Sequence, residues 1–199
     1  LLEALGITGG PVVVAGSVHP GEGRELALAV LALRKLFPGI LLVVVPRHLE
    51  KTGALVMEFE AEGLEGSLRS QGRPVERQSV LFWDAYGHLE ELYGECDAAF
   101  VGGSLIPHGG QNPVEPARAG KPVFFGPHME NFAEPTRRLL ACGAARQVQD
   151  GPSLAAALGK LLLDRPGLAR AGKAAREEAL SGGGAADRIA EAVAEILER

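Results

Sequence analysis

The feature that most constrains the fold is the alternation of short aliphatic runs with segments of helical spacing. Residues 12–15 and 40–45 are aliphatic throughout, which is typical of strands covered on both faces. Between them, residues 22–37 carry apolar side chains such as Leu26 and Val30 at the spacing of one helix face. A strand, a helix and a second strand are therefore expected in succession.

The same alternation continues along the chain. Further strands are expected at 67–70, 80–83, 98–101, 122–125 and 145–148, and further helices at 49–62, 88–95, 113–119, 131–142 and 153–163. The tail from residue 166 is expected to form two helices, broken at the glycines 182–184. This order predicts an α/β protein with a Rossmann-like, doubly wound parallel sheet and helices on both faces.

Composition narrows the functional classes. The 199 residues carry a formal net charge of −5 and contain no block of Lys and Arg, which argues against a nucleic-acid partner. No apolar stretch approaches the roughly 20 residues of a membrane span. The five histidines show no paired spacing such as HExxH, so no metal site is expected.

Five polar loops each follow a predicted strand directly. They read GSVHPGEG (16–23), PRH (46–48), WDAYGH (83–88), GGSLIPHGGQNPVEP (102–116) and GPHMENF (126–132). The carboxyl ends of parallel strands meet at one edge of a sheet, where ligands of such folds bind. The sequence therefore predicts one ligand site at this edge.

The longest of these loops has features of an anion site. Gly103 lets the backbone approach a ligand closely, because glycine has no Cβ. Asn112 is expected to cap a helix whose first residue is Pro113, and free N–H groups at such a helix start attract phosphate. Glu115 lies in the first turn, where it either complements the helix dipole or accepts hydrogen bonds from a ribose diol.

Other loops supply further candidates. Ser17 either donates to a phosphate or carboxylate or simply turns the chain into the next helix. Arg47 places a permanent cation at a strand end, where it can bind an acidic group at two points. Gly87 precedes another helix start, which can receive polar ligand atoms.

Taken together, these loops resemble the C-terminal half of the bacterial Kdo transferases, which transfer 3-deoxy-D-manno-octulosonate (Kdo) from CMP-Kdo to a lipid A precursor. The match is carried by residues 16–23, VPRH at 45–48 and the run from LYGECD to HMENF at 92–132. The resemblance extends to about residue 163. It implies the two-domain GT-B architecture, in which the C-terminal domain binds the nucleotide and the N-terminal domain carries the acceptor site and an acidic general base.

The resemblance also implies a role for each loop. The residues implied in donor binding are Gly103, Ser104, Gly109, Gly110 and Asn112 around the CMP phosphate, Glu115 at the ribose, Arg47 and His48 at the cytosine or sugar edge, Ser17 at the phosphate or Kdo carboxylate, and His108 and Gly87 beside them. Two segments depart from the family pattern. The family has HEGEE where this chain has His19–Gly23, and Thr-x-Gly-Glu where this chain has Ala85–His88, so the roles of Glu22 and His88 stay open.

The implied function is the donor domain of an inverting, metal-independent Kdo transferase of lipopolysaccharide biosynthesis, with CMP-Kdo as donor and no cofactor. No catalytic residue is expected in this chain, since the base would come from a preceding half. The chain alone is then expected to be soluble and to bind CMP without catalysing transfer. The full-length protein would contact its lipid A acceptor at the cytoplasmic face of the inner membrane. Residues 1–184 are expected to form the donor domain, and 185–199 a helix that crosses to the other domain.

Two alternatives remain open. Another GT-B protein, such as a UDP-sugar transferase or a non-hydrolysing sugar-nucleotide epimerase, predicts a preference for UDP over CMP. A non-catalytic nucleotide-binding module predicts that Arg47→Ala and Glu115→Ala leave nucleotide affinity unchanged.

Overall fold

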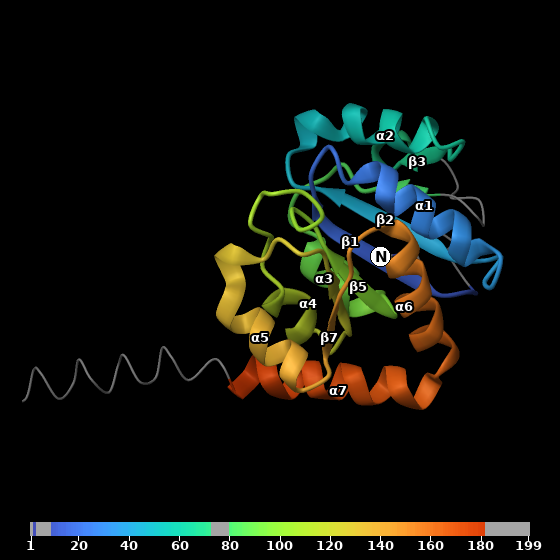
Figure 1. Cartoon of the computed structure of the whole chain (residues 1–199). Coiled ribbons are helices and arrows are strands. Elements are labelled where there is room, and N and C mark those ends of the chain that lie inside the picture. The colour runs from blue at the N-terminus through green and yellow to red at the C-terminus, as the bar shows by residue number, and fades with distance from the viewer. Residues whose placement is uncertain (1, 3–8, 73–79, 182–199) are drawn as a thin grey trace, which may run out of the picture.

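The computed structural model describes residues 2, 9–72 and 80–181. Figure 1 shows one sheet with helices packed on both sides. The strands are β1 (Val12–Val18), β2 (Leu41–Pro46), β3 (Gly66–Leu68), β4 (Val80–Phe82), β5 (Ala98–Val101), β6 (Val123–Phe125) and β7 (Ala145–Gln147). The α-helices are α1 (Gly23–Arg34), α2 (Thr52–Glu60), α3 (Leu89–Glu95), α4 (Val114–Arg118), α5 (Ala133–Ala141), α6 (Gly151–Leu163) and α7 (Arg165–Ser181).

The sheet is parallel throughout and has the order β3-β4-β2-β1-β5-β6-β7. On one side of β1 lie β2, β4 and β3 in that order, and on the other side lie β5, β6 and β7. The order therefore reverses between β1 and β5, which is the point where doubly wound sheets hold their ligands. The predicted fold class is confirmed.

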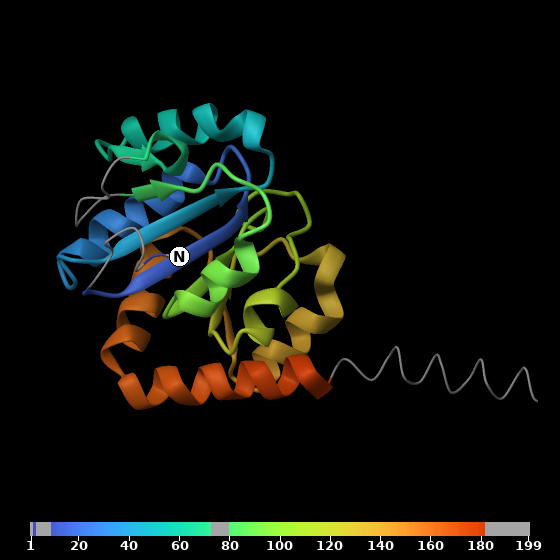
Figure 2. The same cartoon turned by 180° about the vertical axis from the view of Figure 1, so that it is seen from behind.

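Alternate side chains of the central strand enter different cores. Val13 and Ala15 of β1 belong to the core beneath α1 and α6, whereas Val14 belongs to the core on the opposite face. Figure 1 shows α1 and α6 on one face, and Figure 2 shows α3 on the other. Because both faces of the strands are buried, the sequence shows continuous aliphatic runs instead of alternation.

Element boundaries differ from the expected ones by a few residues. The expected strand at 67–70 is observed at Gly66–Leu68, and the helix expected at 49–62 opens with a 3-10 turn before α2. Helix α6 starts earlier than expected because Asp150 and Ser153 form a reciprocal capping box. The expected domain boundary and the helix at 185–199 lie outside the described residues.

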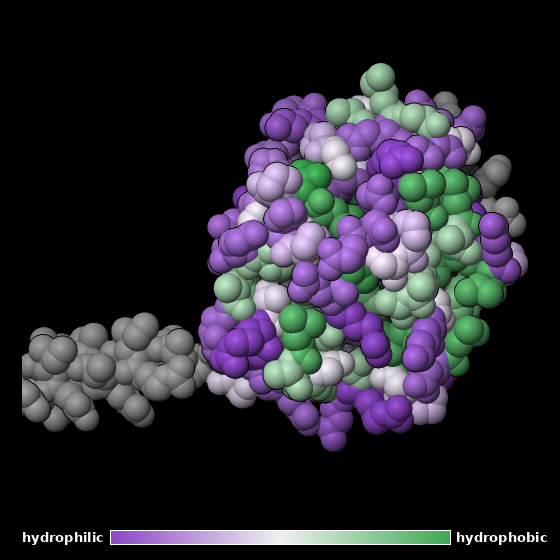
Figure 3. Space-filling model, in the orientation of Figure 1, coloured by the Kyte–Doolittle hydropathy of each residue, from purple (hydrophilic) through white to green (hydrophobic). Residues whose placement is uncertain are grey.

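The surface carries scattered apolar side chains. Leu36 at the end of α1 and Leu163 at the end of α6 are exposed, and apolar surface is visible on the flank where these helices lie (Figure 3). Within the residues that the structure describes, no helix combines the length and the hydropathy needed to cross a bilayer.

The central core makes a first prediction. Phe100 of β5 is fully buried, so Phe100→Ala should lower the free energy of unfolding by about 3–5 kcal/mol through lost burial and an unfilled cavity. Leu163→Ala, a truncation of an exposed leucine, should change it by less than about 0.5 kcal/mol. Urea denaturation of both variants measures the difference, and equal effects would contradict the described core.

Candidate functional site

The candidate site lies at the switch point of the sheet, where the loops after β1 and β5 leave neighbouring strands. The loop after β1 spans residues 19–22 and leads into α1, and the loop after β5 spans residues 102–113 and leads into α4. The two backbones touch, because a Cβ at Gly102 would lie 2.3 Å from the carbonyl oxygen of Ser17. The Gly102 N–H also donates to the Gly16 carbonyl at 2.8 Å.

A buried carboxylate joins these loops. Glu22 has no exposed surface. Its Oε2 accepts the N–H groups of His19 at 3.0 Å and Gly103 at 2.7 Å, and its Oε1 accepts those of Ser104 and Leu105, both at 3.0 Å. Burial raises the pKa of the Glu22 carboxyl, while the four N–H donors pull that pKa back down. Glu22 thus acts as an internal anion that fixes the start of the β5 loop.

This arrangement changes what Gly103 and Ser104 can offer a ligand. Their N–H groups already donate to Glu22. The Ser104 hydroxyl donates to the Val101 carbonyl at 2.5 Å and accepts the Gly126 N–H at 2.8 Å, and the residue is fully buried. The structure gives both residues a structural role, and their contact with a phosphate stays a prediction.

The remainder of the β5 loop depends on two glycines with positive φ. Gly109 (φ 82°) and Gly110 (φ 76°) have backbone angles that side chains rarely adopt. A Cβ at Gly109 would lie 2.4 Å from the Asn131 side-chain nitrogen, and one at Gly110 would lie 2.4 Å from the Met129 sulfur. Asn131 also donates to the His108 carbonyl at 3.2 Å. The loop after β6 therefore braces the loop after β5.

Asn112 orients Glu115 at the surface. The Asn112 side-chain oxygen accepts the Val114 N–H at 3.0 Å, and its nitrogen donates to Glu115 Oε1 at 3.1 Å. The expectation for the helix start needs correction: α4 begins at Val114, Pro113 takes the cap position, and the helix has five residues. Asn112 still ties down the first turn, from one residue further back. Glu115 is exposed and available to a ligand.

Three histidine side chains meet beside these loops. The His19 ring centroid lies 4.5 Å from that of His108 and 5.8 Å from that of His48. His19 is buried, whereas His48 and His108 are exposed. His19 Nε2 lies 3.2 Å from the Gln111 side-chain nitrogen. We call His19, His48 and His108 the histidine cluster.

The cluster is surrounded by positive charge. The pKa of His19 is lowered to about 4, mainly because the ring is buried, with repulsion from His108, His48, Arg47 and Lys51 as further causes. His19 is therefore neutral near pH 7. Its Nε2 can then accept a hydrogen bond from Gln111, which holds the ring in place.

The other predicted residues are placed more loosely. Ser17 is half-buried and has a φ of 55°, and it is the only non-glycine with positive φ in the described part of the chain, a conformation often found at functional sites. Arg47 is exposed, and its N–H donates to the Val18 carbonyl at 2.9 Å. Gly87 has open space where a side chain would be. Among the described residues, no group of three or more His, Cys, Asp or Glu is placed to hold a metal ion.

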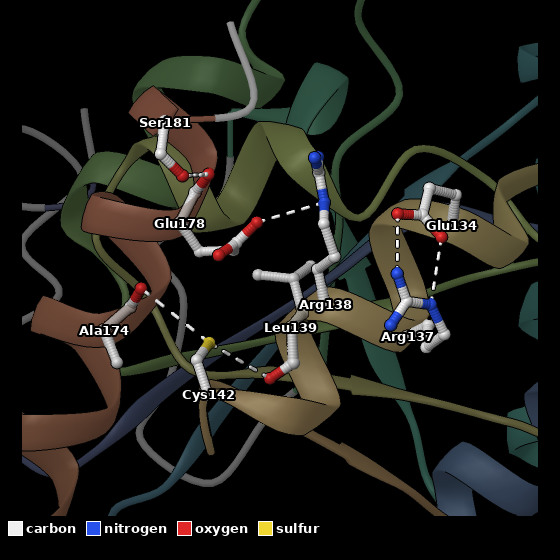
Figure 4. Close-up of polar contacts among 8 residues, drawn as sticks. All are labelled: Glu134, Arg137, Arg138, Leu139, Cys142, Ala174, Glu178 and Ser181. Atoms are coloured by element: carbon white, nitrogen blue, oxygen red, sulfur yellow. Dashed lines mark hydrogen bonds and ion pairs between the residues drawn. The ribbon is translucent and has the colours of Figure 1, made fainter.

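A separate cavity of about 200 Å³ lies between α4, α5 and α7. Figure 4 shows Arg138 of α5 and Glu178 of α7 pointing toward one another at this place, and their ion pair measures 3.0 Å. The cavity lies against the helices of one face and includes none of the loop residues described above. It is a gap between helices and not part of the candidate site.

Sequence reasoning left the role of Glu22 open and missed Gln111 as a site-forming residue. An acidic residue at a helix start ordinarily complements the dipole, and no spacing rule indicates that its side chain turns toward a loop 80 residues away. Glu58 was also missed, because it lies near the end of α2 and far in sequence from the groups it contacts. From α2 its carboxylate accepts the N–H groups of Gly21 at 2.7 Å and Gly23 at 2.8 Å, so a distant residue caps α1.

The Glu22 contacts lead to a prediction. Glu22→Gln places an amide NH₂ against backbone N–H donors, and each buried donor left unsatisfied costs about 1–3 kcal/mol. The free energy of unfolding should fall by about 2–4 kcal/mol. Glu60→Gln, which changes an exposed carboxylate of α2, is the control. Equal denaturation midpoints for the two variants would show that Glu22 does not hold the loop.

The histidine cluster leads to a third prediction. With a folded-state pKa of about 4 against an ordinary 6.5, His19 binds fewer protons in the folded than in the unfolded protein between these pH values. Its contribution to stability is therefore complete above about pH 6.5 and is lost as the pH falls toward about 4. His19→Asn should remove this dependence, so the stability difference between wild type and variant should shrink on acidification. Parallel pH profiles would contradict the assigned pKa.

Comparisons with known proteins identify relatives of the chain. No protein-family model matches the chain. A 3-deoxy-D-manno-octulosonic acid transferase of Haemophilus influenzae is 35% identical over 191 residues, which are 95% of this chain and 45% of that protein. One of Bordetella pertussis is 37% identical over 150 residues, which are 73% of this chain and 35% of the relative. The chain thus spans less than half the length of these relatives.

Solved structures show which part of these relatives the chain corresponds to. The crystal structure of the C-terminal CMP-Kdo binding domain of WaaA from Acinetobacter baumannii superposes with a TM-score of 0.79 at 25% identity, covering 90% of this chain and 94% of that one. Anabaena HepE, solved with UDP and glucose, has a TM-score of 0.70 at 19% identity over 98% of this chain and 51% of its own, a likeness of fold. By sequence and by fold, the chain belongs to the bacterial Kdo transferases and corresponds to their C-terminal domain.

Proposed function

We propose that this chain is the donor-binding domain of a Kdo transferase and that it binds CMP-Kdo at the edge of the sheet where the loops after β1 and β5 meet. The observation that carries the proposal is the match over 90% of the chain to a domain described as CMP-Kdo binding. The position of these loops supports it, because they lie at the switch point and combine an exposed acidic residue, Glu115, with a cationic flank.

The chemistry proposed for the whole protein is inverting transfer. A base outside this chain removes the proton of the acceptor hydroxyl, the oxygen attacks the anomeric carbon of Kdo, and the bond to the phosphate oxygen breaks so that CMP leaves. Arg47 and Lys51 are placed to offset the negative charge that develops on the departing phosphate. In this scheme no metal takes part, and the acceptor is a lipid A precursor of lipopolysaccharide biosynthesis at the inner membrane.

Within this scheme each loop has one task. Glu115, held by Asn112 at 3.1 Å, accepts hydrogen bonds from the ribose hydroxyls. Gly109 and Gly110 allow the β5 loop to pack against the loop after β6, because a side chain at either position would meet Asn131 or Met129, and the loop held in this way receives the phosphate. The 199-residue chain is then expected to bind nucleotide and to leave the acceptor unmodified.

Calorimetric titration with CMP and UMP tests the proposal. CMP should bind more tightly than UMP, and Glu115→Ala should weaken CMP about 10- to 100-fold, the effect of losing charge-assisted hydrogen bonds of about 1.5–3 kcal/mol. Glu60→Ala, on the exposed face of α2, should leave the affinity as it is.

The other outcomes separate the alternatives. Preference for UMP, together with binding of UDP-glucose, would replace CMP-Kdo by a UDP-sugar donor. Affinity unaffected by Glu115→Ala would show that the nucleotide does not bind at these loops.

A further inference from the structure

The histidine cluster brings together more cationic and imidazole groups than one phosphate needs. The phosphodiester of a CMP-linked sugar carries one negative charge. Around His19 the structure gathers two permanent cations, Arg47 and Lys51, and the imidazoles of His48 and His108. Glu50 faces this group, with its Oε1 3.8 Å from His48 Nδ1, and Glu22 lies behind it, where four backbone N–H groups donate to its carboxylate. Glu50 and the phosphate balance the two permanent cations, so the imidazoles are left to bind a second anion when they are protonated.

The arrangement of the histidine cluster is determined by the fold. Its three histidines come from three segments, after β1, after β2 and after β5, so their meeting depends on the fold. His19 is 7% exposed, and the exposed rings of His108 and His48 contact it. Gln111 fixes the His19 ring at 3.2 Å, and a Cβ at Gly103 would approach that ring to 3.3 Å. Because the His19 ring is neutral, it adds no charge to the cluster.

We propose that His48, His108 and Arg47, arranged around the neutral ring of His19, form a subsite for a carboxylate carried by the transferred sugar. The inference rests on the proposed function and deepens it: the loop after β5 holds the nucleotide, and the cluster recognises the acidic sugar. An imidazolium that contacts a carboxylate holds its proton more tightly, so binding of the sugar is coupled to proton uptake at His48 and His108. Arg47 supplies a charge that does not depend on pH.

The assignment is to a carboxylate on the sugar and not to a second phosphate. A UDP-sugar also carries two negative charges, but both lie on one pyrophosphate. In a CMP-linked 2-keto sugar acid the carboxylate is attached to the same carbon as the phosphate oxygen, so the second charge lies on the sugar side. The two charge patterns can be distinguished by ligands that carry one and lack the other.

The test uses the 199-residue chain and three ligands: cytidine 5′-(methyl phosphate), which has the phosphodiester alone, freshly prepared CMP-Kdo, and UDP-glucose. CMP-Kdo should bind about tenfold more tightly than the methyl diester at about pH 6.5, and this ratio should fall about threefold or more at about pH 8.5, as imidazoles lose their protons. In the double variant His48→Gln/His108→Gln the ratio should fall to about the value that the wild type shows at about pH 8.5, because Arg47 remains, and it should lose its pH dependence. Lys160→Gln, which removes a cation of α6, should retain both.

Histidine NMR adds a readout that a purely structural role would not move. Addition of CMP-Kdo should raise the pKa of two imidazoles, whereas the methyl diester should leave the pKa of both unchanged. The signals of these two imidazoles should be absent from the spectrum of the double variant.

Three results would overturn the inference. A ratio of CMP-Kdo to methyl diester affinity that is unchanged in the double variant removes the carboxylate from the cluster while leaving nucleotide binding intact. Binding of UDP-glucose with the same pH dependence and the same loss in the double variant assigns the cluster to a second phosphate. Absence of binding by every cytidine ligand overturns the proposed function as well.

Discussion

The buried carboxylate of Glu22 is the contact on which the site depends. It lies where the two halves of the sheet meet, and its four hydrogen bonds join the start of α1 to the loop after β5. A buried anion is costly unless its hydrogen-bonding capacity is filled, so loop and carboxylate stabilise one another. With the β5 loop fixed, His108, Asn112 and Glu115 take defined places at the edge of the sheet. Glu58 repeats the device on the outer side, where it holds Gly21 and Gly23 from α2.

The fold was largely predictable because its strands are buried on both faces. Runs such as residues 12–15 and 40–45 have no polar alternation, and only a parallel sheet covered by helices explains them. The ends of elements were less predictable. Helix α6 begins where a capping box forms and α4 where Asn112 captures the Val114 N–H, and such local contacts shift a boundary by one or two residues.

The meeting of the polar loops at one edge was predictable, but the contacts between them were not. Five polar loops after five strands had to share an edge, and the structure brings His48, His108 and Glu115 to that edge. Gly103 and Ser104 were expected around the CMP phosphate, but in the structure their N–H groups donate to Glu22. Which backbone groups remain for a ligand depends on the orientation of one carboxylate, and pairwise spacing carries no information about it. The histidine cluster was equally hidden, because its members are 29 and 60 residues apart in sequence.

The central claim is that a cytidine nucleotide binds between the loops after β1 and β5. A crystal structure of the chain with CMP tests it most directly. The account predicts CMP on the edge of the sheet where these loops meet, with the ribose at Glu115, the phosphate toward the histidine cluster and the four Glu22 hydrogen bonds intact. CMP bound in the cavity between α4, α5 and α7 would contradict it. So would a β5 loop whose N–H groups no longer contact Glu22 and bind the phosphate instead.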